Sequence, residues 1–512
     1  MTVSVRLDPQ GMSRWVSTDD PITATDVGDR CTPEAIGKAV SHLDGVRVTS
    51  ATVNTSGRTE NTPPKFDSIM ELPPYIEDLP DFCDVRLERT TPAGHVAEIT
   101  VWVPLAWNER FLGTGGGGML TSSPWIEIET FRVVPMPVAL RNGFATAMTD
   151  GGIRDPRLNA YALDEKTREI DRELLRDWSY RATHDMTVIG KAVTEAIHGV
   201  PPRYSYFSGA SGGGRQAMAE AQRYPDDYDG IWSVDPAINW TKFVPAGVWP
   251  ALVMKELGNV VTPAKFEAFR AKAVAADRAV DPAELVGTQT SDGEITELDA
   301  EVVRKIWEGP RTADGEFLWY GLHPEAESWG ASILQGGLAC TTEVDGELVP
   351  EPFIIAKDWI GAYLLRDPEW DWRTLTFEQF RELFARSVEE FADFATDDPD
   401  LSGLRDSGGK LILTHTTGDE VIFAQGSTDY FRRVHQEMGG QEQVADFARL
   451  FMGSGDGHVY VTATSAGATI GGTMSALMRW VEEGVAPDEI PAQGYDMETG
   501  KVTLSRTIPA FR

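Results

Sequence analysis

Cysteine is scarce in this chain, with three in 512 residues: Cys31, Cys83 and Cys340. No C-x-x-C spacing occurs among them, which excludes zinc sites of the finger or ribbon type and thioredoxin-type redox chemistry. Cys31 and Cys83 could form one disulfide if the chain is exported, or both could stay reduced.

Long apolar runs are also missing. No uninterrupted hydrophobic stretch approaches the ~20 residues that a membrane-spanning helix needs. The first ten residues lack the basic start and the apolar core of a secretory signal. The sequence therefore predicts no membrane span and no membrane partner, and a cytoplasmic location is the expectation.

Basic residues are outnumbered: 46 lysines and arginines stand against 79 aspartates and glutamates, giving a formal net charge of -33. Such a charge repels the phosphates of nucleic acids and of anionic lipids. Nucleic acid is therefore not expected as a partner, and the charge is interpreted as a solvated acidic surface. Hydrophobic residues make up 41% of the chain, which is enough for a large packed core.

The most informative stretch that is present lies around Ser211. A short aromatic strand, residues 204–207, leads into Gly209-Ala-Ser-Gly-Gly213, which fits G-x-S-x-G, and a helix-forming run, residues 215–223, follows. A strand-to-helix turn this tight strains the backbone of its serine, which only small neighbours tolerate. It also exposes the hydroxyl and aims helix N-terminal amides at a developing oxyanion. Ser211 is the predicted nucleophile, and a plain glycine-rich turn is the alternative.

Strands and helices alternate between residues 81 and 240, which predicts a parallel sheet covered by helices. Residues 241–400 are instead helical, aromatic-rich and charged in pattern, and buried-strand patterns resume at 409–415 and 448–452. The predicted fold class is α/β: an α/β-hydrolase core with a mostly parallel sheet and an inserted, mainly helical lid domain. The predicted boundaries are 1–80 for an N-terminal wrapping segment, 81–240 for the first part of the core, 241–400 for the lid domain and 401–512 for the second part of the core.

In this fold an acid and then a histidine follow the serine along the chain, each on a loop after a strand. Asp419 follows the strand predicted at 410–415, and His458 lies in the glycine-rich loop after the strand predicted at 448–452. His458 is expected to accept the Ser211 proton, and Asp419 to hold the histidine tautomer. The competing candidates for the acid are Asp406, Asp429 and Asp456, and His184 and His415 are interpreted as structural.

A second glycine-rich segment, residues 113–118, fits G-x-G-x-x-G. A dinucleotide site requires a helix that opens directly from the glycines, and Ser-Ser-Pro at 122–124 would interrupt such a helix. The favoured interpretation is an oxyanion loop, in which missing side chains let backbone amides approach a carbonyl oxygen. The predicted oxyanion-hole donors are Gly117 and Gly118 in this loop and Gly212 after the nucleophile, with a plain glycine-rich turn as the alternative.

These segments resemble the tannase and feruloyl esterase family of α/β-hydrolases, which includes mono(hydroxyethyl) terephthalate hydrolase. The resemblance covers the chain from about residue 80 to its end, and its most specific part is the run EAQRYPDDYDG at 220–230. The family's acid and histidine motifs fall on residues 409–419 and 457–458, which contain Asp419 and His458. Further matching segments are residues 82–85, 107–112, 145–152, 181–191, 202–209 and 213–216.

The resemblance implies hydrolysis of an aromatic carboxylic ester through an acyl-serine, with a lid domain that forms the substrate pocket. The expected partner is a small-molecule aromatic ester, such as a gallate, hydroxycinnamate or terephthalate ester, and no cofactor is expected. The alternative is an acyltransferase or a non-catalytic binding protein on the same fold, acting on an intracellular metabolite ester or lactone. The oligomeric state stays open. The lid tryptophans are interpreted mainly as core, with one or two lining the site: Trp307, Trp319, Trp329, Trp359, Trp370 and Trp372.

The chain departs from the family pattern at two positions next to the site. Family members usually carry a cysteine just before the nucleophile and another just after the histidine, joined as a disulfide, where this chain has Ala210 and Val459. The resemblance implies that Cys31 and Cys83 either keep an N-terminal bridge or are both reduced. The family's lid often holds calcium, but residues 276–282 lack evenly spaced oxygen ligands, so no metal ion is predicted.

Overall fold

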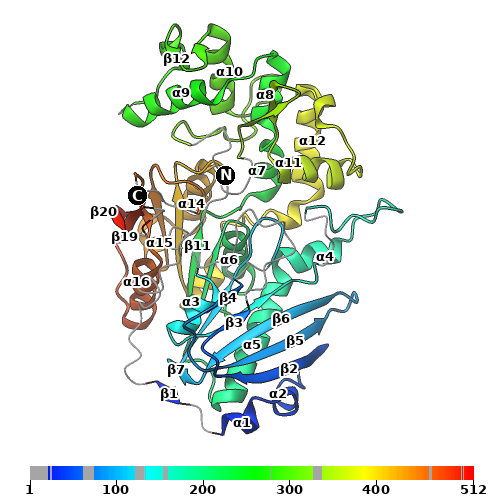
Figure 1. Ribbon diagram of the computed structural model, residues 1–512, viewed down its shortest axis with the longest axis vertical. Coiled ribbons are helices and arrows are strands. Elements are labelled where there is room, and N and C mark those ends of the chain that lie inside the picture. The colour runs from blue at the N-terminus through cyan, green and yellow to red at the C-terminus, as the bar shows by residue number, and fades with distance from the viewer. Residues whose placement is uncertain are drawn as a thin grey trace.

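The computed structural model describes residues 21–23, 26–60, 74–121, 132, 134–153, 159–276, 278–326, 337–459, 464–496, 499 and 501–512. Within these residues a nine-stranded sheet runs through the centre of the molecule (Figure 1). In spatial order the strands are β17 (Ala448–Gly453), β16 (Lys410–Thr416), β11 (Gly230–Val234), β10 (Tyr204–Ala210), β8 (Arg110–Thr114), β9 (Ala145–Thr149), β6 (Val96–Pro104), β5 (Phe82–Thr90) and β2 (Val46–Asn54). The strands from β17 to β9 are parallel to one another, and β6, β5 and β2 continue the sheet antiparallel. The predicted mostly parallel sheet is thus confirmed.

Helices cover both faces of this sheet, so its parallel strands are buried on both sides and are apolar along their length. In α5 the buried residues Met186, Ile189, Val193 and Ile197 recur at helical spacing and pack on one face. One face is covered by α2 (Pro33–Ala39), α5 (Ala182–His198), α6 (Gly212–Arg223) and α14 (Gln425–Glu437), and the other by α3 (Met136–Arg141) and α16 (Ile470–Glu483). A second sheet packs beside α16 and consists of β18 (Gly467–Ala468), β19 (Glu489–Tyr495) and β20 (Val502–Pro509).

The N-terminal segment, expected to wrap the core, also contributes the edge strand β2 to the sheet. A disulfide between Cys31 and Cys83 attaches this segment to β5. Short elements complete this part of the chain and the connections of the core: α1 (Val27–Arg30), α4 (Arg172–Arg176), α13 (Ser402–Ser407), α15 (Gln441–Ala445), β1 (Ile22–Thr23), β3 (Thr59–Glu60), β4 (Tyr75–Ile76) and β7 (Ala106–Trp107).

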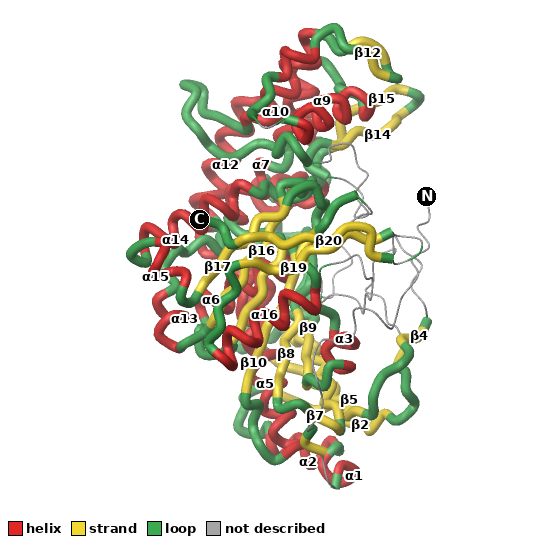
Figure 2. Tube along the Cα trace, turned by 90° about the vertical axis from the view of Figure 1, so that its left-hand side faces the viewer, coloured by secondary structure: helices red, strands yellow, loops and turns green. Residues whose placement is uncertain are grey.

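The chain between β11 and β16 forms the helical insertion that the sequence predicts. Figures 1 and 2 show its helices gathered at one end of the molecule, above the sheet. Two short hairpins, which the sequence pattern did not indicate, lie among these helices. Among the described residues, no helix is both long and apolar enough to cross a membrane. The elements of the insertion are α7 (Trp240–Ala246), α8 (Trp249–Leu257), α9 (Pro263–Ala275), α10 (Glu297–Glu308), α11 (Ile354–Asp358), α12 (Phe377–Glu390), β12 (Gln289–Thr290), β13 (Gly293–Glu294), β14 (Cys340–Val344) and β15 (Glu347–Glu351).

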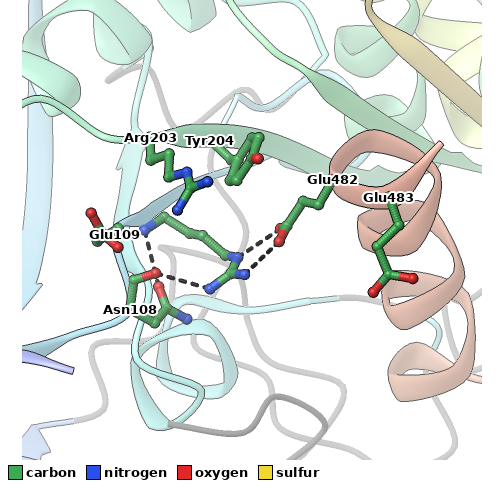
Figure 3. Close-up of a pocket in the computed structure, with 7 residues that line it drawn as sticks. Asn108, Glu109, Arg203, Tyr204, Glu482 and Glu483 are labelled. Atoms are coloured by element: carbon green, nitrogen blue, oxygen red, sulfur yellow. Dashed lines mark hydrogen bonds and ion pairs between the residues drawn. The ribbon is translucent and has the colours of Figure 1, made fainter. Parts of the chain in front are cut away.

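A polar pocket of about 200 Å³ lies where β8 and β10 begin (Figure 3). Arg110 donates there to both carboxylate oxygens of Glu482, at 2.8 and 2.6 Å, and so ties β8 to α16. Tyr204 at the start of β10 lines this pocket, whereas Ser211 follows the other end of the same strand. The pocket is therefore separated from the predicted nucleophile by the length of β10.

Replacing Cys31 and Cys83 by serine is expected to lower the free energy of unfolding by about 2–4 kcal/mol, because the bridge closes a long loop in the unfolded chain. The two cysteines are 52 residues apart. Thermal unfolding with and without reductant measures the effect, and reductant should lower the midpoint of the wild type alone. Equal midpoints for the wild type and the variant would show that the bridge does not stabilise the fold.

Candidate active site

Ser211 occupies the turn between β10 and α6 with φ 61° and ψ −118°. This backbone conformation is strained for a residue with a side chain. Three hydrogen bonds hold it: the Ser211 N–H donates to Val234 O at 2.9 Å, and the Ser211 carbonyl accepts from the N–H groups of Arg215 and Ala237. Ser211 is partly exposed between buried neighbours. The predicted strand, turn and helix are all present.

The small residues around Ser211 allow two backbones to touch. A Cβ on Gly209 would lie 2.3 Å from the carbonyl oxygen of Gly213, so the turn itself has no room for a side chain. A Cβ on Gly212 would lie 2.4 Å from Gly118 O and 2.9 Å from Gly118 N. The turn after β10 and the glycine loop after β8 therefore pack backbone against backbone, which only glycine permits here.

The glycine loop is held against α6 by hydrogen bonds. Gly116 N–H donates to Gln216 Oε1 at 2.8 Å, and Gly213 N–H donates to Gly116 O at 2.9 Å. Gly117 and Gly118 are partly exposed beside Gly212. The structure therefore brings the three predicted oxyanion donors together, and it also assigns a holding contact to Gln216, which the sequence pattern did not indicate.

A dinucleotide site would need a helix that opens from these glycines. The described residues that follow β8, 115–121, form turns and loop instead. Residues 122–124, on which the sequence argument against such a helix relied, lie outside the described residues.

Asp419 is buried in the loop after β16 and both of its oxygens are occupied. Its Oδ1 accepts the N–H groups of Val421 and Ile422, each at 2.8 Å. Its Oδ2 accepts from His458 Nδ1 at 2.8 Å and from His415 Nε2 at 3.1 Å. Burial alone would raise the pKa of Asp419, but the charge of His458 and the hydrogen bonds from His415 and His458 outweigh it, so the pKa lies below 3.8. The carboxylate therefore stays ionised.

The competing acids are each paired with an arginine. Asp406 pairs with Arg405, Asp429 with Arg433, and Asp456 with Arg132. In the described part of the chain, Asp419 is the carboxylate that hydrogen bonds to the ring of His458. His415, interpreted from the sequence as structural, contacts the same Asp419 oxygen, and its other nitrogen bonds Ser427 Oγ at 2.7 Å.

His458 is fully buried in the loop after β17. Its backbone N–H donates to Glu420 Oε2 at 3.0 Å, and its ring Nδ1 donates to Asp419. Its Nε2 is buried and has no hydrogen-bond partner among the described residues. Burial lowers the pKa of His458, but the charge and hydrogen bond of Asp419, with the charges of Asp235 and Glu420, outweigh it and raise the pKa above 6.5. The free nitrogen is the one that a general base would use.

The loops of Ser211 and His458 are joined through the end of β11. Val234 accepts the Ser211 N–H, and the next residue, Asp235, accepts the Val459 N–H at 2.8 Å. Ala210 and Val459, the positions where the family pattern has cysteines, pack in one apolar cluster. No hydrogen bond joins Ser211 Oγ to His458 Nε2 within the described residues, and such bonds often form only in the substrate complex.

In the described parts of the chain, two groups of side chains bring metal-ligating atoms within 4.8 Å of one another: His184, Glu220 and Asp227, and Asp235, Asp419 and His458. His184 already pairs with Asp227 at 2.6 Å. In the second group, Asp235 already accepts the Val459 N–H, and Asp419 already accepts from His458 Nδ1.

In the segment compared with the family's calcium loop, Asp281 caps a short helical turn and pairs with Arg304. The carboxylate of Asp281 therefore stabilises the local fold of this segment. Residue 277 lies outside the described residues.

The lid tryptophans mostly pack in the core, as interpreted from the sequence. Trp359 is fully buried against Trp240 and Phe391, and Trp319 and Trp372 are also buried. Trp307 and Trp370 are partly buried against the apolar cluster that contains Trp319 and Trp359. Trp329 lies outside the described residues.

Comparisons with known proteins identify a family that matches most of the chain. A family model described as tannase and feruloyl esterase matches residues 83–512. The chain is 38% identical over 431 residues to a probable feruloyl esterase of Arthroderma benhamiae, covering 79% of this chain and 77% of that protein.

Solved structures share the fold. The tannin acyl hydrolase of Aspergillus niger superposes with a TM-score of 0.79 at 21% identity, covering 96% of this chain and 93% of the other. Feruloyl esterase B of Aspergillus oryzae superposes with a TM-score of 0.74 at 23% identity, covering 95% and 96% of the two chains. These likenesses confirm the predicted α/β-hydrolase fold.

Asp419→Asn is expected to lower kcat by roughly 10⁴-fold, because an amide can no longer hold His458 in the tautomer that leaves Nε2 free. Asp406→Asn is the matched control, since this exposed carboxylate contacts only Arg405 among the described residues. Steady-state hydrolysis of a chromogenic ester measures both variants. A near-normal rate for Asp419→Asn would remove Asp419 from the assignment.

Glu420→Gln tests the electrostatics around His458. Burial and the charge of Asp419 raise the pKa of Glu420 to about 7. The glutamine oxygen can still accept the backbone N–H of His458, but the negative charge that Glu420 gains as pH rises through about 7, and that raises the histidine pKa, is gone. Activity requires neutral His458 and is lost as pH falls through its pKa, so the acid limb of kcat/KM should lie above pH 6.5 in the wild type and at lower pH in the variant. An unmoved limb would contradict this.

The same variant has an expected effect on stability. The folded pKa of Glu420 lies above its unfolded value of 4.5, so the wild type loses stability as pH rises from 4.5 through about 7. Glu420→Gln removes this loss. Denaturant unfolding at pH 5 and pH 8 measures the free energy of unfolding of both proteins. The variant should become more stable relative to the wild type at pH 8 than at pH 5. An equal difference in the free energy of unfolding at both pH values would argue against a buried, protonatable Glu420.

Proposed function

Because the chain belongs to the tannase and feruloyl esterase family of carboxylic ester hydrolases, we propose that it cleaves an aromatic ester through an acyl-serine on Ser211. The observation that carries the proposal is the pairing of Asp419 with His458 Nδ1, which leaves Nε2 free on a loop bonded to the strand end that holds Ser211. The serine, the acid and the histidine each follow the carboxyl end of a parallel strand, which is where sheets of this kind place their sites.

In the proposed reaction, His458 Nε2 takes the proton of Ser211 Oγ as this oxygen attacks the ester carbonyl carbon. The oxyanion that forms accepts hydrogen bonds from the N–H of Gly212 and from that of Gly117 or Gly118. His458 then returns the proton to the leaving alkoxide, and the C–O bond to the alcohol breaks. The same histidine then takes a proton from a water molecule as the water attacks the acyl carbon. The bond from that carbon to Ser211 Oγ breaks, His458 returns the proton to Ser211 Oγ, and the carboxylic acid is released.

The support for an aromatic acyl group comes from the relatives. Those compared above are named feruloyl esterase and tannin acyl hydrolase. We therefore propose a hydroxycinnamate, gallate or related aromatic ester as the substrate class. Each of these esters carries the carbonyl group that the reaction above requires.

Ser211→Ala is expected to abolish the release of aromatic acid while leaving the fold intact. Ser208→Ala is the matched control, because it removes a buried hydroxyl that has no hydrogen-bond partner among the described residues, from the same strand and three residues earlier. Mass spectrometry of the products from a panel of gallate, hydroxycinnamate, benzoate and terephthalate monoesters measures all three proteins.

Two results would overturn the proposal. Release of acid by Ser211→Ala at the wild-type rate would exclude Ser211 as the nucleophile. If the wild type releases no acid from any ester of the panel, these aromatic esters are excluded as substrates. Transfer of the acyl group to an added alcohol, in place of its release to water, would identify an acyltransferase.

A further inference from the structure

We propose that Arg132, Asp235 and Asp456 form a buried ionic clamp that holds the His458 loop in position over Ser211. Arg132 is then a positioning residue, and the inference rests on the proposed function. The three side chains are 3%, 0% and 0% exposed. The sequence did not indicate that these three residues form a group, because they lie more than 100 residues apart along the chain.

Arg132 contacts the His458 loop on both sides of the histidine. Its guanidinium donates to Asp456 Oδ2 at 2.5 Å and to Gly457 O at 3.1 Å, before His458. Its backbone N–H donates to Val459 O at 2.8 Å, after His458. One residue therefore fixes the segment that carries the proposed base at two points.

Asp235 connects this clamp to the nucleophile. The guanidinium of Arg132 donates to Asp235 Oδ2, and the same oxygen accepts the Val459 N–H at 2.8 Å. The Asp235 N–H donates to Thr414 O at 2.8 Å, and the preceding residue, Val234, accepts the Ser211 N–H. The histidine loop is thus tied to the strand end that supports the serine.

Asp456 connects the clamp to the next strand. Its Oδ1 accepts from Thr416 Oγ1 at 2.9 Å, at the end of β16. Asp419, the partner of His458, follows this strand three residues later. The clamp therefore contacts the end of β11, which accepts the Ser211 N–H, the end of β16, which precedes Asp419, and the loop that carries His458.

The loop needs such a restraint, because its backbone is strained at Val459. This residue has φ 55°, and a β-branched side chain rarely adopts the left-handed conformation. Both backbone polar groups of Val459 are held by the clamp, its N–H by Asp235 and its carbonyl by Arg132. Without these bonds the segment can relax to ordinary backbone angles, and the adjacent His458 would move.

The test is the rate at which a fluorophosphonate probe labels Ser211, since this reaction depends on activation of the serine by His458 and requires no substrate pocket for an aromatic acid. Arg132→Lys keeps the charge but loses the planar fork, and Asp235→Asn keeps the shape but loses the charge. Arg110→Lys is the matched control. Arg110 also donates two hydrogen bonds to carboxylate oxygens, both of them on Glu482, but it lies at the opposite ends of the strands (Figure 3).

Labelling should slow about 10²-fold in Arg132→Lys and in Asp235→Asn, as expected for a displacement of about 1 Å, and should change little in Arg110→Lys. Loss of the Asp235 charge should also move the acid limb of the labelling rate to lower pH, because this charge raises the pKa of His458. A merely structural role would lower the unfolding midpoint without either change.

A folded Arg132→Lys that labels at the wild-type rate would overturn the inference. If Arg132→Lys does not fold, Asp235→Asn decides by the same two readouts. Labelling of Ser211→Ala at the wild-type rate would mean instead that the proposed nucleophile is wrong, so failure of the inference and failure of the proposed function give different results.

Discussion

The hydrogen bond between Asp419 Oδ2 and His458 Nδ1 is the contact on which the remaining site geometry depends. Both side chains are fully buried, so an unpaired partner would carry a large desolvation cost. The pairing fixes which histidine nitrogen carries the proton, and leaves Nε2 as the base. Two backbone N–H groups and His415 satisfy the rest of the carboxylate, and these donors favour its charged form.

The parallel sheet explains how distant residues reach this bond. Ser211, Asp419 and His458 follow β10, β16 and β17, whose carboxyl ends lie at one edge of the sheet. The glycine loop after β8 joins them because Gly212 allows backbone contact with Gly118. The fold thus supplies the approximate positions, and glycine contacts, Gln216 and the buried carboxylates set the final ones.

The sequence predicted those parts of the site that are coded locally. The G-x-S-x-G turn, the strand before Asp419 and the glycine-rich loop of His458 each combine an apolar run with small turn residues, and the structure has a strand followed by a turn at each place. It did not predict that His415 shares the Asp419 oxygen, or that Asp235 holds Val459. Asp235 and Val459 lie 224 residues apart, so their contact depends on the fold. His415 lies only 4 residues before Asp419, but the sequence pattern does not show which oxygen its ring contacts. The edge strand β2 was missed because its exposed, partly polar pattern has little in common with a buried strand.

The proposed pairing of Asp419, His458 and Ser211 can be observed in a crystal structure of the protein with Ser211 phosphonylated, because the adduct imitates the tetrahedral intermediate. We expect one adduct, on Ser211 Oγ, with a phosphonyl oxygen that accepts the N–H of Gly212 and that of Gly117 or Gly118. We also expect His458 Nε2 within hydrogen-bonding distance of the adduct, with Nδ1 still bonded to Asp419. An adduct on another residue, or an imidazole turned away from Asp419, would exclude this pairing as the catalytic arrangement.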